Sequence, residues 1–500
     1  MNGKGMFWRR WTGSLIGWLG AMALGGLLAV ACGGKAPAAE PDGGMSGSPP
    51  GPAEPVLNAV YAAPDGYETG AGTIDYPCTI YRAIQKAEAG QTIYVRGGEY
   101  RLTRRIELEK VGTADRPYRL FAFPGEKPVF DFSDMGRNPG IRIGKGCYWH
   151  LKGIEIRNAY NDGVKIVDGS HNTFENCVSH HNGGNGFNMG YGHEVPGAPH
   201  PNPDGEKAAF NTFINCDAHH NFDWFTVNDG VPEPGTNADG FSVKSRSGRG
   251  NLFVGCRAWS NSDDAWDFYE CGFAVQVIGC WAWKSGVWSD HVEMYRDRTR
   301  GGVLTEELFD GNGNGFKIGG GCLHNPAREC NAASQGTHVL RNCISFGHPG
   351  RGFDQNNHQY GAWIENCLGF GNGTNFGFWT PNEGGTSWRF RNNVSFGGDR
   401  NDRFVIPGVV ISADAGNTWN LTPGDFASYP SQFVSLEERD AEAPRGSDGS
   451  LPERFGRLKS GSIFIDRGVP TESIEGDGFR YSAISYDGPA PDMGAYEYVP

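Results

Sequence analysis

The sequence predicts an all-β protein whose chain winds into a right-handed parallel β-helix. A short phrase recurs about every two dozen residues through the middle of the 500-residue chain, and no amphipathic helices separate the repeats. Glycine is frequent, with 77 residues beside 30 prolines, yet aromatic residues make up 12% of the chain. This composition excludes a disordered low-complexity chain and favours many short strands joined by tight turns.

The recurring phrase is usually Asp or Asn, a small residue, an apolar or aromatic residue, and a polar residue. It occurs at residues 162–165, 185–188, 239–242, 264–267, 290–293, 314–317 and 351–354. Most neighbouring phrases are 23 to 26 residues apart, and the two larger gaps indicate coils that carry inserted loops. Coils of this length bury their apolar side chains only against neighbouring coils, so the phrases predict one coil each in a solenoid.

The two ends of the predicted solenoid differ from its middle. Ile80, Ala83, Ile84 and Ala87 follow helical spacing just before a strand at 92–96, which predicts a helix that caps the N-terminal end. The repeat is lost after residue 425. We therefore expect a β-helix domain over 57–425 and an irregular segment, 426–500, that packs on it.

The first 32 residues have the pattern of an export signal: Arg9 and Arg10, an apolar stretch over about 15–30, and then Ala-Val-Ala-Cys ending at Cys32. This ending resembles a bacterial lipoprotein signal with Cys32 as the lipidated residue. The alternative is a signal peptide cleaved near Ala31 without lipid. Residues 33–56 are rich in Pro, Gly and Ala and predict a flexible tether. We expect a secreted protein, held at the cell surface or outer membrane only through a lipid.

Charge and cysteine content limit the partners. The formal net charge of −13 argues against broad nucleic-acid binding and means that an acidic polymer would need a local cation. Four cysteines follow Asn in apolar segments and predict stacked, buried thiols: Cys177, Cys216, Cys343 and Cys367. The sequence does not decide whether Cys322 and Cys330 form a local disulfide. The cysteines show no spacing typical of a zinc site. We expect a monomer.

Four aspartates converge in the middle of the predicted solenoid. Alternation along the strands places Asp239 and Asp264 one coil apart, with Asp263 and Asp267 beside the second. Four such carboxylates repel one another unless a cation lies among them, and a hard, oxygen-rich pocket suits Ca²⁺. A solvated acidic turn is the alternative, and it is favoured for any single aspartate but disfavoured for four on adjacent coils.

Lys317 is the candidate base. Counting 290–293 as a coil, the phrases place Lys317 outward on the same face as Asp267 and two coils away, about 10 Å. A nearby cation would lower the pKa of the amine and supply the neutral form that a base requires. A glycoside hydrolase with paired carboxylates is an alternative, because inverting enzymes also hold two acidic groups several ångströms apart.

These segments resemble family 9 of the polysaccharide lyases, the pectate-lyase group that uses a lysine base. The resemblance rests on NADGF around Asp239, NSDDAWDFYE around Asp264, GNGFKIGG around Lys317, and GFDQNNHQYG around Asp354. It implies that Asp239, Asp263, Asp264 and Asp267 ligate Ca²⁺ and that Lys317 takes the C5 proton of a uronate. Pectate or a related polymer would then be cleaved by β-elimination to 4,5-unsaturated ends. The segment 281–313 is longer than the family pattern and is expected to reshape the cleft.

Other residues remain open to two interpretations. Arg351, Lys284 and Lys244 are candidates for binding substrate carboxylates, although exposed cations are more often solvated. The tryptophans at 259, 281, 283 and 288 fit either sugar stacking or the core. A non-catalytic β-helix adhesin or carbohydrate-binding surface protein with structural Ca²⁺ is the alternative function. Lys317 favours the lyase, because a structural cation needs no lysine on the adjoining face.

The lipoprotein signal predicts that Cys32→Ser abolishes lipid attachment. Metabolic labelling with a radioactive fatty acid should mark the wild-type chain and leave the variant unmarked, because only the thiol of Cys32 is available to the lipid-transfer step. Equal labelling of both chains would contradict the prediction.

Overall fold

The structure is a computed structural model that describes residues 58–190, 207–244, 247–271, 273–320, 337–380, 388–404, 406, 415–420, 426–476 and 479–500. The chain divides into two units, Met1–Ala53 and Glu54–Pro500. Cys32, the tether, Cys322 and Cys330 lie outside the described residues. Within those ranges, no helix is both long and apolar enough to cross a membrane.

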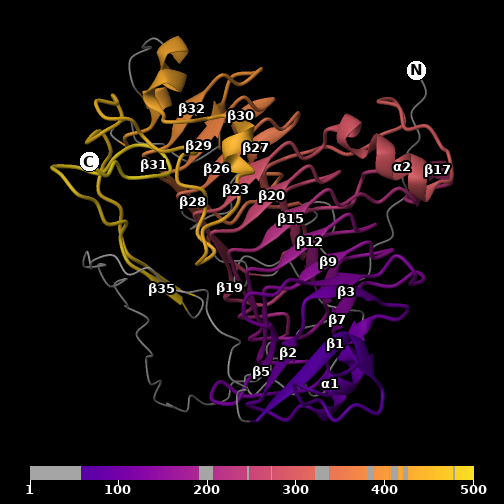
Figure 1. Ribbon diagram of the computed structural model, residues 1–500. Coiled ribbons are helices and arrows are strands. Elements are labelled where there is room, and N and C mark those ends of the chain that lie inside the picture. The colour runs from indigo at the N-terminus through magenta and orange to yellow at the C-terminus, as the bar shows by residue number, and fades with distance from the viewer. Residues whose placement is uncertain are drawn as a thin grey trace, which may run out of the picture. The chain divides into compact units, whose positions relative to one another are not determined.

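The parallel β-helix predicted from the repeat is confirmed. From β1 onward the chain forms successive coils, and each coil adds a strand to two or three long parallel sheets (Figure 1). We call these sheets A, B and C in the order in which a coil visits them. Sheet A contains, in spatial order, β1 (Ala59–Tyr67), β2 (Thr92–Val95), β5 (Tyr118–Ala122), β8 (Trp149–Lys152), β11 (Thr173–Glu175), β14 (Thr212–Ile214), β19 (Asn251–Val254), β22 (Val275–Ile278), β25 (His338–Arg341), β28 (Ala362–Glu365) and β31 (Trp388–Arg391).

The other two long sheets run beside sheet A along the same axis. Sheet B contains β3 (Gly98–Arg101), β6 (Pro128–Asp131), β9 (Glu155–Arg157), β12 (Val178–His180), β15 (Asp217–His219), β20 (Arg257–Trp259), β23 (Trp281–Trp283), β26 (Ile344–Phe346), β29 (Leu368–Phe370) and β32 (Val394–Phe396). Sheet C contains β4 (Ile106–Glu107), β7 (Ile141–Ile143), β10 (Val164–Ile166), β13 (Phe187–Gly190), β18 (Phe241–Lys244), β21 (Trp266–Asp267), β24 (Phe316–Lys317), β27 (Arg351–Asp354), β30 (Thr374–Phe378) and β33 (Arg403–Phe404).

The interior is built from side chains that repeat at the same place in each coil. Phe213 lies between Phe174 and Phe253, with ring centroids 4.9 and 4.8 Å away, and all three rings are buried. A second column in sheet C stacks Phe241 on Trp266 at 4.9 Å. Strand alternation turns every second residue inward, so one aromatic residue per coil is enough to form a continuous core.

The turn from sheet A to sheet B explains the Asn-Cys pairs. Asn176 and Asn215 adopt φ of 52° and 53°, a left-handed conformation that Asn tolerates better than most residues. The following thiols point inward, and the Cys216 thiol donates to the Phe174 carbonyl of the preceding coil at 3.4 Å. All four cysteines predicted to be stacked are buried and free, as are the equivalent Cys256 and Cys280.

The N-terminal end carries the predicted helix, α1 (Ile80–Lys86). Thr79 is its N-cap and accepts a hydrogen bond from the Arg82 backbone N–H at 3.3 Å. Ile80 and Ala83 are buried in the same apolar cluster as Ile93 of β2, so the helix closes over the first coils. Figure 1 shows α1 beside β1 and β2, at the end of the solenoid that carries the first strands.

Beyond the last coil, the chain turns back along sheet B. It forms η2 (Thr418–Asn420), η3 (Phe426–Gln432), α3 (Glu438–Ala441) and the hairpin β34 (Ile474–Gly476) and β35 (Phe479–Tyr481). Phe455 and Phe464 of this segment join one apolar cluster with Trp281 and Trp283, whose side chains lie on the outer face of β23. These two tryptophans and Trp259 are therefore buried beneath the C-terminal segment and do not form a sugar platform.

One predicted coil is wrong. Residues 290–293 lie in η1 (Trp288–His291) and α2 (Val292–Arg298), which form an insertion between β23 and β24. Strand β21 pairs directly with β24, aligning Asp267 with Lys317. The distance of this phrase from its neighbours matches the length of one coil. The residues after it are charged and show no alternation of apolar side chains, so they form a helix instead of strands.

Packing of the core predicts a contrast between two valine-to-alanine changes. Val277 in β22 is 0% exposed, whereas Val231 in the hairpin β16 (Val227–Asn228) and β17 (Val231–Pro232) is 57% exposed. Val277→Ala should lower the free energy of unfolding by about 2 kcal/mol, because it removes buried methyl groups and leaves a cavity. Val231→Ala should change it by less than about 0.5 kcal/mol. Urea titration followed by tryptophan fluorescence tests this, and equal losses would contradict the assigned core.

Candidate active site

The candidate site lies on the outer face of sheet C, near the middle of the solenoid. Four polar side chains occupy the same position on successive strands, in the register Ser242, Asp267, Lys317 and Asp354. The aromatic side chain that precedes each of the four is buried in the core, so alternation turns the polar residue outward. The strands therefore hold these groups one coil, about 4.8 Å, apart.

Three carboxylates converge here. Oxygens of Asp239, Asp264 and Asp267 lie within 4.8 Å of one another, and all three residues are buried. Asp239 and Asp264 occupy the turns just before β18 and β21, and the backbone N–H of Asp264 donates to Asp239 Oδ1 at 3.0 Å. The backbone and side-chain N–H groups of Asn314 donate to Asp264 Oδ1 at 2.9 and 2.8 Å. One oxygen of each of these two carboxylates is thus fixed by the turns.

Two lysines face the other oxygens. Lys317 Nζ lies 2.7 Å from Asp264 Oδ2 and 3.4 Å from Asp267 Oδ2. Lys244 Nζ lies 2.6 Å from Asp239 Oδ2 and 2.7 Å from Asp267 Oδ2. The Oδ2 atoms of all three carboxylates therefore accept hydrogen bonds from ammonium groups, and Asp267 is shared by both lysines.

Burial and charge shift the pKa values in this group. Burial, with further repulsion among the carboxylates, raises the pKa of Asp239 to about 6 in spite of Lys244. Burial alone would lower the pKa of Lys317, but Asp264 and Asp267 outweigh it and raise that pKa well above its usual value. Without a further cation, Lys317 is therefore a charged ammonium group and cannot act as a base.

The remaining predicted residues fall in different places. Asp263 is buried and accepts a hydrogen bond from the Asn312 backbone N–H at 3.2 Å, but it does not belong to the group of three converging carboxylates. Arg351 lies one coil beyond Lys317, 3.2 Å from Asp354, with its guanidinium 4.5 Å from the Trp379 ring centroid.

Two expectations of position are corrected. Lys317 lies on the strand next to Asp267, one coil away instead of two, because 290–293 forms no coil. Lys284 follows the end of β23 in sheet B and pairs with Glu438 of the C-terminal segment at 2.7 Å, so it does not join the site.

Lys244 belongs to the site itself, pairing with Asp239 and Asp267, whereas the role expected from the sequence is only a contact with substrate. The sequence carried the signal, because Lys244 is two residues after Ser242 and so lies on the same outward face of β18. Ser242 itself donates a hydroxyl hydrogen bond to Asn185 Oδ1 at 2.7 Å and belongs to the network that supports Asp239. Lys244 supplies half of the positive charge opposite the three carboxylates.

The donor set fits a calcium ion. Ca²⁺ takes six to eight oxygen ligands in a flexible arrangement, and carboxylates are its preferred protein donors. The three buried carboxylates repel one another, and their Oδ2 atoms accept hydrogen bonds from the lysine ammonium groups, with the Ser242 hydroxyl as a further donor to Asp239 Oδ2. A divalent cation would satisfy the same oxygens if the two ammonium groups moved aside.

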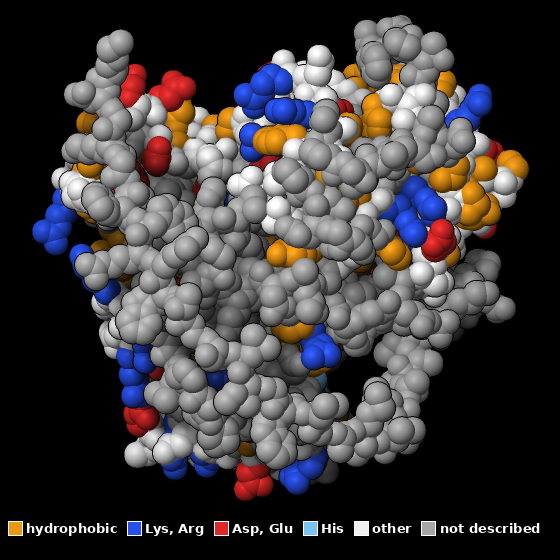
Figure 2. All heavy atoms as spheres, turned by 180° about the vertical axis from the view of Figure 1, so that it is seen from behind, with side chains coloured by type: hydrophobic (Ala, Val, Ile, Leu, Met, Phe, Trp, Pro, Cys, Tyr) orange, Lys and Arg blue, Asp and Glu red, His pale blue; other side chains and the backbone are white. Residues whose placement is uncertain are grey.

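Charge over the rest of the visible surface does not form one basic tract. On the face shown in Figure 2, the described Lys and Arg side chains lie in several separate groups, with Asp or Glu side chains beside some of them. This agrees with the overall charge of −13. An acidic polymer would therefore be held by local contacts rather than by a broad positive face.

A parallel β-helix with carboxylates and lysines on one sheet face defines the class of protein, a β-helix polysaccharide lyase. Residues 60–393 match the family described as "Pel9A-like, right handed beta helix region". The chain belongs to this family, which is family 9 of the polysaccharide lyases.

Relatives along most of the chain agree. The chain is 33% identical over 453 residues to the pectate lyase L of Dickeya chrysanthemi, covering 87% of this chain and 90% of that protein. It is 28% identical over 423 residues to the pectate lyase PEL9 of Emericella nidulans, covering 78% and 90%. The crystal structure of pectate lyase Pel9A has a TM-score of 0.68 at 32% identity, covering 88% of this chain and 96% of that one. A rhamnogalacturonan lyase shares the fold, with a TM-score of 0.61 at 24% identity over 81% and 97%.

The paired lysines predict that Lys244→Met destabilises the protein most when no divalent cation is present. The change leaves buried carboxylates without a charge partner, so in chelator the free energy of unfolding should fall by about 3 kcal/mol or more. Added Ca²⁺ should restore most of this loss. Lys152→Met is the control, because Lys152 pairs with Glu175 on an exposed part of sheet A and should change stability by less than about 1 kcal/mol with or without Ca²⁺. A Lys244→Met loss that Ca²⁺ does not reduce would contradict the cation site.

Proposed function

We propose that this protein cleaves pectate, or a related polymer of 4-linked uronates, by Ca²⁺-assisted β-elimination with Lys317 as the base. The observation that carries the proposal is the position of Lys317, with its amine 2.7 Å from Asp264 and 3.4 Å from Asp267. The named pectate lyases among its relatives support the same substrate class. No other lysine or arginine in the described ranges forms ion pairs with two members of the converging group, except Lys244.

The reaction needs a proton acceptor and stabilisation of negative charge. The C5–H bond of the uronate breaks, its proton passes to the neutral Lys317 amine, and its electron pair forms the C4–C5 double bond as the C4–O bond breaks. The oxygen of the departing sugar then takes up a proton. Calcium held by Asp239, Asp264 and Asp267 would supply charge stabilisation for the uronate carboxylate as the adjacent carbon becomes anionic.

Charge balance in the site supports this pairing of roles. Burial is the largest single effect on the pKa of Lys317 and lowers it. While the carboxylates face only ammonium groups, they together outweigh burial, raise this pKa and keep the amine protonated. Carboxylates committed to a divalent cation no longer stabilise the ammonium form to the same extent. Lys317 can then release its proton and approach the substrate, and the Lys244 ammonium group, which pairs with Asp239 and Asp267 while no cation is bound, moves aside from their Oδ2 atoms.

The two alternative functions make different demands on the site. A paired-carboxylate hydrolase needs one protonated and one ionised acid with room for water between them. Here each of the three carboxylates has an oxygen bound to a lysine, and three oxygens lie within 4.8 Å. An adhesin with structural Ca²⁺ needs no lysine among the ligands. The observed pairing therefore favours the lyase.

The decisive measurement is the product formed from uronate polymers. Purified protein incubated with polygalacturonate and Ca²⁺ should release oligosaccharides with a conjugated double bond, detected by ultraviolet absorbance and mass spectrometry. Chelation should abolish turnover. A product that has gained water and carries no double bond would identify a hydrolase instead, and polymer binding without any turnover would identify a binding protein.

Lys317→Ala should reduce kcat by a factor on the order of 10² to 10⁴, the usual effect of losing a general base, with a small change in KM. Lys284→Ala is the matched control and should keep normal turnover. Lys284 follows the end of β23 in sheet B, away from the site, and pairs with Glu438 of α3. Lys244→Ala tests which of the two lysines in the site is the base. If it loses more kcat than Lys317→Ala while still binding Ca²⁺, Lys244 is the base.

A further inference from the structure

Two successive coils each carry a pair of histidines where sheet B ends. His180 and His181 close β12, and His219 and His220 close β15. The ring of His180 stacks on His219 at 4.8 Å with an interplanar angle of 7°, and the ring of His181 stacks on His220 at 5.2 Å and 2°. The four imidazoles therefore form a block of two by two, built by the repeat of the coil.

The ring nitrogens face one another within this block. Nδ1 of His180 lies 2.6 Å from Nδ1 of His181, and the same atoms of His219 and His220 lie 2.9 Å apart. One ring nitrogen from each of His180, His181 and His219 lies within 4.8 Å of the others. We propose that these three histidines bind a transition-metal ion of the Zn²⁺ class at a site separate from the carboxylate group of sheet C. Nitrogen donors suit Zn²⁺, Ni²⁺ or Cu²⁺ and do not suit Ca²⁺.

Glu155 orients the first ligand. Its Oε1 lies 3.1 Å from Nε2 of His180, on the neighbouring strand β9 of the preceding coil. In the tautomer that donates Nε2–H to this carboxylate, Nδ1 of His180 is an acceptor and faces Nδ1 of His181. A carboxylate behind a histidine in this way is typical of metal-ligating histidines, because it fixes the tautomer and strengthens the donor.

The surroundings of His181 and His219 favour the neutral ring, which is the form that binds metal. Burial, with repulsion from neighbouring histidines, lowers the pKa of His181 to about 3. Burial also lowers the pKa of His219 well below its usual value. Ligation therefore displaces no proton from these two rings at neutral pH.

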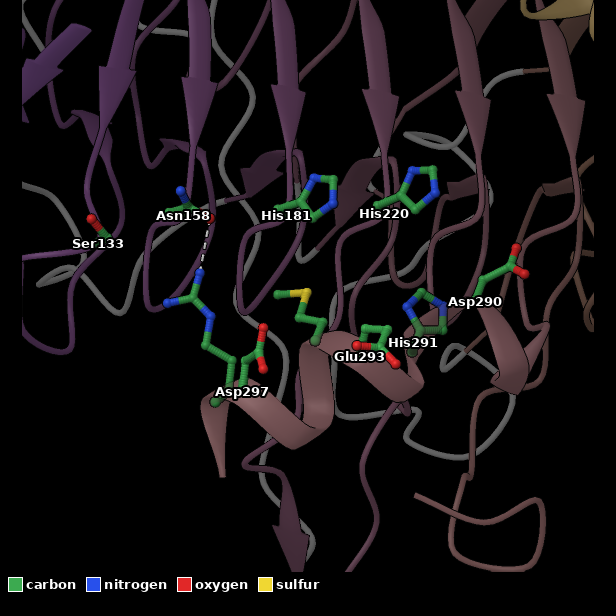
Figure 3. Close-up of a pocket in the computed structure, with 10 residues that line it drawn as sticks. Ser133, Asn158, His181, His220, Asp290, His291, Glu293 and Asp297 are labelled. Atoms are coloured by element: carbon green, nitrogen blue, oxygen red, sulfur yellow. Dashed lines mark hydrogen bonds between the residues drawn. The ribbon is translucent and has the colours of Figure 1, made fainter. Parts of the chain in front are cut away.

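A cavity of about 470 Å³ gives the block an opening to solvent. His181 and His220 line one wall, and the insertion forms the other with Asp290 and His291 of η1 and Glu293 of α2 (Figure 3). Of the three proposed ligands His181 lines this cavity, which leaves room for water or a further ligand beside that ring. Zinc sites with three protein ligands commonly keep such an open position.

The separation of the His180 and His181 nitrogens requires only a small adjustment. Two nitrogens on one tetrahedral ion, with bonds of about 2.0 Å, are separated by about 3.3 Å, compared with the 2.6 Å between His180 and His181. Rotation of one ring about its side-chain bonds covers this difference. Stacking of aromatic rings is enough to explain why His219 lies over Trp259, with ring centroids 4.2 Å apart. Stacking does not require that the nitrogens of His180 and His181 face each other, or that Glu155 contacts His180.

The test is direct metal binding by the full chain, expressed without a polyhistidine tag and freed of metal by chelation. Isothermal titration with Zn²⁺, in saturating Ca²⁺ so that the carboxylate group is occupied, should give one ion per chain with Kd of about 10 μM or tighter. His180→Gln and His219→Gln should each weaken binding at least tenfold, and Glu155→Gln about tenfold.

His150→Gln is the matched control. His150 pairs with Glu175 at 2.9 Å, as His180 pairs with Glu155, but it has no second histidine nitrogen facing it. Its zinc affinity should equal that of the wild type. Lyase activity and circular dichroism should be unchanged in all four variants, which separates this site from the proposed catalytic one.

Three results would overturn the proposal. The first is wild-type binding weaker than about 1 mM, and the second is equal affinity in the wild type and in a His180→Gln/His219→Gln double variant. The third is loss of zinc binding in Asp264→Asn alone. If the histidine variants fail to fold, the test is spectroscopy of Co²⁺ or Cu²⁺ bound to the wild-type chain. Optical or electron paramagnetic resonance spectra should show nitrogen ligands. Spectra that show only oxygen ligands would exclude the site.

Discussion

The charge balance between three buried carboxylates and two lysines on sheet C is the constraint on which the site depends. Each group alone would be costly to remove from water, and together they are tolerated because every Oδ2 has an ammonium partner. The coil supplies the geometry, since register places Asp267 and Lys317 side by side. Turn hydrogen bonds from Asn314 fix the second oxygen of Asp264. The same arrangement that stabilises the protein without metal is the one that a divalent cation would replace.

Much of the fold could be predicted from the sequence because a β-helix is repetitive. One aromatic residue per coil, an Asn in the left-handed conformation and a following Cys recur at fixed spacing, so Phe213, Asn215 and Cys216 mark a coil without knowledge of its neighbours. The false coil at 290–293 shows the limit of spacing. A phrase shorter than a coil fits by chance, and only the strand patterns on both sides distinguish a coil from an insertion.

The candidate site was predictable to the level of residues but not of contacts. Alternation placed Asp267 and Lys317 on one face, and the aspartates indicated a cation. Two facts could not follow from the pattern. Lys284 pairs with Glu438, which is more than a hundred residues further along the chain. Lys244 shares Asp267 with Lys317, which depends on how long side chains distribute themselves among competing carboxylates. Both are tertiary outcomes of charge pairing, which periodicity does not encode.

The C-terminal segment has a consequence for biogenesis. Trp281, Trp283, Ile344 and Phe346 lie on the outer face of sheet B and are covered by residues such as Phe455 and Met493, which the ribosome adds after all the strands of the solenoid. A nascent chain can stack its coils as they emerge, but this aromatic stripe stays uncovered until residues 426–500 have also been synthesised. The unfinished solenoid therefore presents adhesive surface to other nascent chains and to chaperones. Premature termination after β33 but before residue 455 would leave a product with assembled coils and a permanently uncovered stripe, prone to aggregate although most of its strands are paired.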